Sequence, residues 1–162
     1  MKKLLLLLFV VLSLKAVAQT VGYTYRPFAA EGCKMNYSVM KQDTAYYIIV
    51  SVSSDRLKFL KESTFLIKNF KGEIIKLQGD LIDNESESTG VLVGNMILPV
   101  TDIISTAQFR IGPEQFEFIK EGISKVRLST IPIEHERTFK KDKIGKKLYT
   151  FYIKAKSKAD DF

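Results

Sequence analysis

Short runs of alternating apolar and polar residues recur along the chain at intervals of roughly ten residues, separated by turn-forming residues. The clearest run covers residues 45–52, where one face carries Tyr46, Ile48, Val50 and Val52. A strand points alternate side chains to opposite faces of a sheet, so this spacing predicts β-strands. About seven or eight such runs with hairpin-like turns are typical of an antiparallel β-sandwich, and we expect an immunoglobulin-like or related one.

Residues 108–130 combine signals for strands and for a helix. An alternating run ends at Ile111, and Pro113 follows at a position that suits the first turn of a helix. Gly122 comes where a helix end in the left-handed conformation requires a residue without a Cβ atom. The segment predicts a strand, a short helix at about residues 113–121 and a second strand, with the helix bridging the two sheets.

The C-terminal segment favours an amphipathic helix at about residues 142–156. Its apolar residues follow helical spacing: Ile144, Leu148, Phe151, Tyr152 and Ala155. A strand is the competing interpretation, because alternate residues are also apolar and Gly145 weakens a helix.

Two other segments are less regular. Residues 80–90 are polar without periodicity, and we expect a mobile loop there, followed by a strand that bends near Gly94. Cys33 is the only cysteine, so it forms no internal disulfide and is either a small buried residue or a free thiol.

The N-terminus has the features of a secretory signal peptide. Lys2 and Lys3 precede an apolar run at residues 4–14, and Ala18 closes a small-x-small cleavage pattern. The run is shorter than the roughly 20 residues that a membrane-spanning helix needs. We therefore expect residues 1–18 to be removed, a single domain at 19–162 without a transmembrane segment, and a periplasmic or extracellular location.

Basic residues exceed acidic ones, 25 to 18, giving a net charge of +7. The densest cluster is the candidate binding site: Lys140, Lys141, Lys143, Lys146 and Lys147. Such a cluster attracts anionic partners, here an unknown protein or an anionic glycan, although a lysine-rich helix face is commonly just solvated. The cluster contains no arginine fork, so we expect no specific recognition of nucleic acid.

No residue pattern indicates a catalytic residue, a metal site or a cofactor. His135 is the only histidine, and Phe139 stands where a zinc-protease helix needs a second one, so we expect His135 to be exposed in a loop or edge strand. The acidic residues near Asp83 and Glu87 lack the glycine of an EF-hand loop. Glycine-rich phosphate-binding motifs are also missing from the sequence.

The pattern from Gly112 to Leu128, together with Lys-Asp-Lys-Ile-Gly-Lys-Lys-Leu at residues 141–148, resembles small exported β-domain proteins of Bacteroidota-type bacteria. These proteins have no assigned function, and the resemblance implies an envelope location without a catalytic residue to transfer. We expect a secreted, non-enzymatic binding or accessory domain of the cell envelope. The alternatives are a hydrolase that uses carboxylates, and an inhibitor or accessory subunit of another exported protein.

Overall fold

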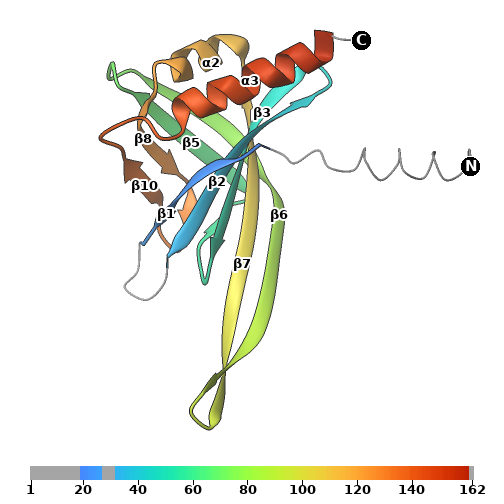
Figure 1. The fold of residues 1–162 in the computed structure, drawn as a ribbon, viewed down its shortest axis with the longest axis vertical. Helices are drawn as coiled ribbons and strands as arrows, with labels where there is room; N and C mark the ends of the chain where they lie inside the picture. Colours follow the sequence, from blue (N-terminus) through green and yellow to red (C-terminus); the bar gives the residue numbers. More distant parts are fainter. Residues whose placement is uncertain (1–18, 27–31, 161–162) are drawn as a thin grey trace, which may run out of the picture.

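The computed structural model describes residues 19–26 and 32–160 of the 162-residue chain. The predicted signal peptide at residues 1–18 lies outside the described residues. The described chain is mainly β, with two helices (Figure 1).

Eight antiparallel strands form one continuous sheet in the order β1-β2-β3-β7-β6-β5-β8-β10. Their bounds are β1 (Val21–Tyr25), β2 (Cys33–Gln42), β3 (Ala45–Ser54), β5 (Glu62–Asn69), β6 (Ile74–Val93), β7 (Met96–Ile111), β8 (Ile123–Leu128) and β10 (His135–Thr138). A separate two-stranded sheet contains β4 (Lys58–Phe59) and β9 (Thr130–Ile131). The expected sandwich is therefore not confirmed, whereas the mainly antiparallel β class is.

The sheet curls until its two edge strands approach each other. The hydroxyl of Tyr23 on β1 lies 2.8 Å from Nε2 of His135 on β10. The ring of Phe139, just after β10, packs edge-on against Tyr23 with the centroids 5.2 Å apart. Within the described residues, β1 and β10 are therefore connected by side chains and not by a backbone ladder, and the curled sheet encloses the core.

The core is built from alternate residues of the strands, as the alternating sequence pattern predicts. On β3 the face with Ile48, Val50 and Val52 is fully buried, as predicted. The opposite face is only half-buried, although β3 lies between β2 and β7. Aromatic rings fill the centre, where Phe65 contacts Phe109 with the centroids 5.3 Å apart.

Helices α2 (Pro113–Lys120) and α3 (Gly145–Asp160) cover one end of the sheet (Figure 1). The rings of Phe116 and Tyr152 stack between them with the centroids 4.1 Å apart. Both predicted helices are confirmed, but α3 begins at Gly145 rather than near residue 142. The carboxylate of Asp142 caps this end of the helix, because it accepts hydrogen bonds from the backbone N–H groups of Gly145 and Lys146, each at 2.8 Å.

Candidate functional site

The hairpin of β6 and β7 extends far beyond the rest of the sheet as a long arm (Figure 1). β5 pairs with β6 as far as Asp80, and β3 pairs with β7 as far as Ile103. Within the described chain, the two strands pair only with each other over residues 83–102, which we call the arm. A turn at Gly94 and Asn95 joins the strands, and Gly94 has a φ of 62°, which glycine adopts without strain.

The predicted mobile loop at residues 80–90 is wrong, because these residues belong to β6. The predicted bend near Gly94 is instead the turn between two strands. Both faces of the arm are exposed, so its strand residues need no apolar alternation, and the ladder to β7 satisfies one side of their backbone.

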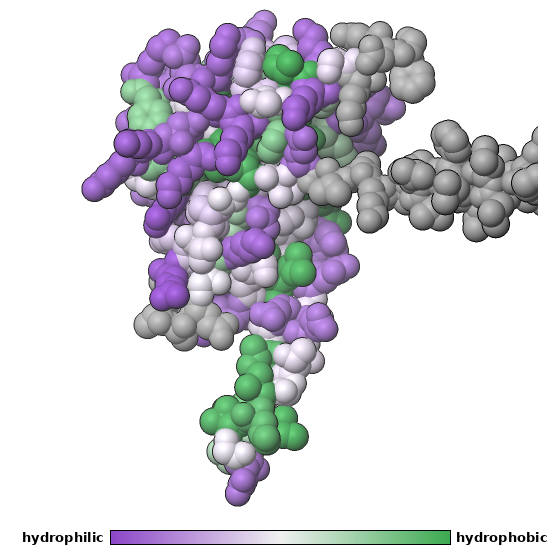
Figure 2. All heavy atoms as spheres, in the orientation of Figure 1, coloured by the Kyte–Doolittle hydropathy of each residue, from purple (hydrophilic) through white to green (hydrophobic). Residues whose placement is uncertain are grey.

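The end of the arm carries an apolar surface that faces solvent. Six large apolar side chains are exposed at residues 91–98, which we call the tip: Val91, Leu92, Val93, Met96, Ile97 and Leu98. Leu92 is 70% exposed and its cross-strand partner Ile97 is 73% exposed. Three consecutive apolar residues on each strand make both faces of the tip apolar. Figure 2 shows this surface at the far end of the molecule.

Behind the tip, one face of the arm is acidic. Glu85, Glu87 and Asp102 line an open hollow of about 380 Å³ together with Ser86 and Ile104. We call the three carboxylates the acidic band. None of them forms an ion pair with another described residue.

Three of the five predicted lysines share a second hollow, at the other end of the molecule. Lys140, Lys141 and Lys143 line an open space of about 410 Å³ together with Arg137, Thr138 and Phe139. We call this space the basic hollow. The lysines are exposed, whereas the ring of Phe139 is almost fully buried beneath them.

The other two predicted lysines, Lys146 and Lys147, lie in the first turn of α3 and do not line the basic hollow. None of the five lysines forms an ion pair within the described residues. Arg137 belongs to the basic hollow but was not singled out from the sequence, because a lone arginine in a short edge strand carries no local signal.

A buried polar cluster joins β1 to β10 beside the basic hollow. The Tyr23 hydroxyl contacts both the Tyr37 hydroxyl and Nε2 of His135, each at 2.8 Å. The ring of Tyr25 packs edge-on against His135 with the centroids 4.7 Å apart. The expectation that His135 is exposed is wrong, since it is fully buried, while its place in an edge strand is confirmed.

Burial keeps this cluster uncharged near neutral pH. Burial, and then the charge of Arg137, lower the pKa of His135 from 6.5 to about 4. Burial also raises the pKa of the Tyr23 and Tyr37 hydroxyls well above 10.0. The cluster thus provides neutral hydrogen bonds that hold the edges together. Cys33 is likewise buried, and burial raises the pKa of its thiol, so it resembles a core residue more than a nucleophile.

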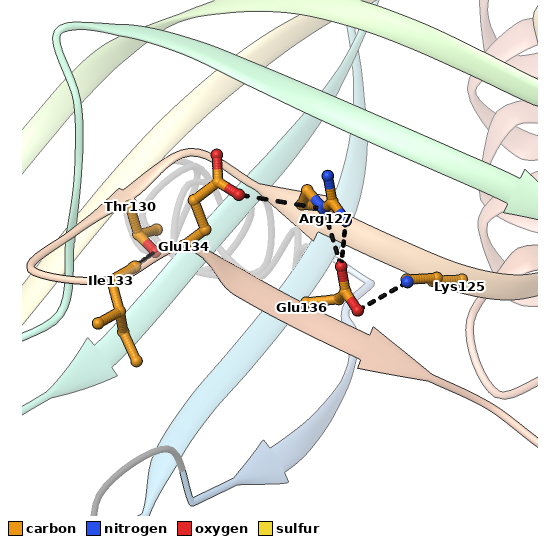
Figure 3. A network of polar contacts seen from close by, with 6 residues as sticks. All are labelled: Lys125, Arg127, Thr130, Ile133, Glu134 and Glu136. Atoms are coloured by element: carbon orange, nitrogen blue, oxygen red, sulfur yellow. Dashed lines mark hydrogen bonds and ion pairs between the residues drawn. The ribbon is translucent and has the colours of Figure 1, made fainter.

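A third hollow, of about 200 Å³, lies over β5 and β8 and is lined mainly by apolar side chains together with Lys68, Lys125 and Arg127. Glu136 lies 2.6 Å from the side-chain nitrogens of both Lys125 and Arg127 (Figure 3). Arg127 also lies 4.0 Å from Glu134, so two carboxylates offset two of the three cations, and the hollow offers less free charge than the basic hollow does.

Among the described residues, no group of three or more His, Cys, Asp or Glu side chains is arranged to hold a metal ion. No helix in the described ranges is long and apolar enough to cross a membrane. Comparisons with protein-family models, curated proteins and solved structures gave no match. The arm and the basic hollow are the two exposed surfaces on which apolar or unpaired charged side chains are concentrated.

Proposed function

We propose that the chain is a secreted, non-enzymatic binding or accessory domain of the cell envelope, and that the arm is the element that contacts its partner. The exposed apolar tip carries this proposal. Soluble monomers rarely expose a contiguous apolar patch above a few hundred Å², and such patches commonly mark interaction sites. Export to the periplasm or the exterior rests on the leader pattern at residues 1–18.

Burial of the tip side chains against a partner lowers the free energy. Burying a fully exposed Leu, Ile or Met side chain stabilises by roughly 1.5–3 kcal/mol, so each partly exposed tip residue gains about 1 kcal/mol in an apolar contact. Ordering the arm and losing rotational freedom offset part of this gain. Because most of the remaining strand residues of the arm are polar, the gain is concentrated at residues 91–98.

The basic hollow supports a second contact with an anionic surface, an acidic protein or an anionic glycan. Arg137 and three lysines surround an open space there, and their charge is not neutralised by described carboxylates. An inhibitor or accessory subunit is also compatible with a projecting arm. The hydrolase alternative has weaker support, because the carboxylates of the acidic band are exposed to water rather than enclosed.

Site-specific photo-cross-linking in the source cells tests the proposal. A photoreactive amino acid in place of Leu92 should give a discrete cross-linked product with an envelope protein. The same residue in place of Leu60, an exposed apolar position between β4 and β5, is the matched control and should give none. Absence of a product at Leu92 and at Ile97, or the same products from Leu60, refutes the arm as the contact element.

A further inference from the structure

The arm is incomplete as a structural unit. Two-stranded hairpins are at best marginally stable alone in water, and residues 83–102 have only each other as strand partners within the described chain. Their outer edges offer unpaired backbone N–H and C=O groups, which exposed strands commonly satisfy by pairing with another chain. The apolar tip and these open edges are both surfaces that a second chain can cover.

Three features of the arm argue against insertion into a lipid bilayer. Unpaired strand edges are not found in the hydrocarbon region, because each unsatisfied backbone group is costly there. Asn95 also places an amide side chain at the apex of the tip. The acidic band follows shortly behind and would repel anionic headgroups. A protein that combines apolar and basic surface fits the arm better.

The other end of this same chain provides such a surface. The basic hollow presents Arg137, Lys140, Lys141 and Lys143 without described ion-pair partners. One exposed apolar side chain, that of Phe70, lies beside the loop that carries the lysines of this hollow. Phe70 is 47% exposed, and its ring and the side chain of Asp142 both lie against Gly122.

We propose that the chain associates with itself head to tail, the tip and acidic band of one copy docking on the basic hollow and the Phe70 surface of the next. This inference rests on the proposed role of the arm as the contact element. The charges are complementary, with three carboxylates in the acidic band and four cations at the basic hollow. The six tip residues and three carboxylates of the acidic band form a smaller contact than the standard 20–30 residues on each side, so the association is expected to be weak and concentration-dependent.

The position of the two surfaces determines the kind of assembly. The arm projects from one end of the long axis, whereas residues 137–143, which line the basic hollow, lead into α3 toward the opposite end (Figure 1). A contact between two different patches is heterologous, so it propagates into rings or open chains rather than stopping at a symmetric dimer. Each copy in the assembly has its tip covered except at a free end.

Sedimentation velocity with complementary variants tests this arrangement. The wild-type chain should form oligomers that grow with concentration and shrink as salt increases. Two variants should each be monomeric. The tip variant carries Leu92→Asp and Ile97→Asp, and the head variant, in which the head is the basic hollow, carries Lys141→Glu and Lys143→Glu. All four residues are exposed, so both variants should fold. An equimolar mixture should form a 1:1 dimer and nothing larger, because one intact tip then meets one intact head.

Leu60→Asp and Lys34→Glu change exposed residues elsewhere and should assemble like the wild type. Dimers of the head variant alone would indicate a tip-to-tip contact and would refute head-to-tail docking. A wild-type chain that stays monomeric at all concentrations, or a mixture that stays monomeric, also refutes it. If the chain is monomeric but the cross-linker at Leu92 still captures another envelope protein, the proposed function stands without self-association.

Discussion

Glu87 and Asp102 lie directly opposite each other on the two strands of the arm, so two carboxylates occupy adjacent positions on one face. Like charges in directly opposite positions weaken a β-ladder. Within the described chain, no ion pair compensates either carboxylate. The arm keeps this repulsive pair although its strands pair only with each other. A cationic partner that binds the arm would relieve the repulsion.

Glu87→Lys should stabilise the arm, because it converts a repulsive cross-strand pair into an attractive one. Cross-strand pairs contribute roughly 0.2–1 kcal/mol, so reversing one changes the local stability by about 1 kcal/mol. Amide hydrogen exchange in residues 83–102 should slow by about fivefold at low protein concentration. Ser86→Lys adds a lysine on the other face and is the control. Equal protection in both variants would show that the facing carboxylates do not limit the stability of the arm.

Tyr23→Phe should destabilise the whole fold, because one hydroxyl connects the two edge strands. Its removal takes a hydrogen-bond partner from Tyr37 and from His135, which are both fully buried. Leaving buried polar groups unsatisfied costs about 1–3 kcal/mol. Urea unfolding should give a loss of this size. Tyr47→Phe, on the half-buried face of β3, should change stability by less than about 0.5 kcal/mol. A similar loss in both variants would contradict the bridging role of Tyr23.

His135 should make the folded state sensitive to mild acid. Its pKa is about 4 in the folded chain and about 6.5 in the unfolded chain, so between these values the unfolded chain binds more protons. The contribution of neutral His135 is fully present above pH 6.5 and decreases as the pH falls toward 4. At pH 5 the wild type should be about 2 kcal/mol less stable than at pH 7.5.

Two measurements isolate this effect. His135 is the only histidine, so its imidazole resonances in an NMR titration report one site and should show a midpoint near pH 4. His135→Gln should have a lower free energy of unfolding than the wild type at pH 7.5. Its free energy of unfolding should change much less between pH 7.5 and pH 5 than that of the wild type. A midpoint near 6.5 would show that the imidazole is hydrated, and the pH dependence would then need another origin.

Local signals predicted the local structure of this chain. The alternation in residues 45–52 predicted β3, and Pro113 with Gly122 correctly bounded a helix, because each signal acts within a few residues. The strand order was not predictable in this way. Both a sandwich and one curled sheet use the same alternating strands, and the difference lies in which edges meet.

The features of greatest functional interest depend on distant partners. His135 is buried by residues of β1 that lie more than a hundred positions earlier, as its contact with Tyr23 at a separation of 112 shows. Residues 83–90 form a strand because β7 pairs with them, although their own sequence resembles a loop. The lysines of the basic hollow were found from charge density alone, but the apolar tip was not recognised, because Val91 to Leu98 also fits a buried strand.

Asp142→Ala should loosen the start of α3 and its attachment to β8. One carboxylate oxygen accepts hydrogen bonds from the backbone N–H groups of Gly145 at 2.8 Å and Ile123 at 3.0 Å, so it joins the helix to the sheet. Loss of an N-terminal cap costs about 1–2 kcal/mol. Urea unfolding should show this loss, and amide exchange should increase in the first turn of α3. Lys156→Ala, exposed on the same helix, should leave both unchanged. Unaltered exchange at Gly145 and Lys146 in the Asp142 variant would show that water replaces the carboxylate without cost.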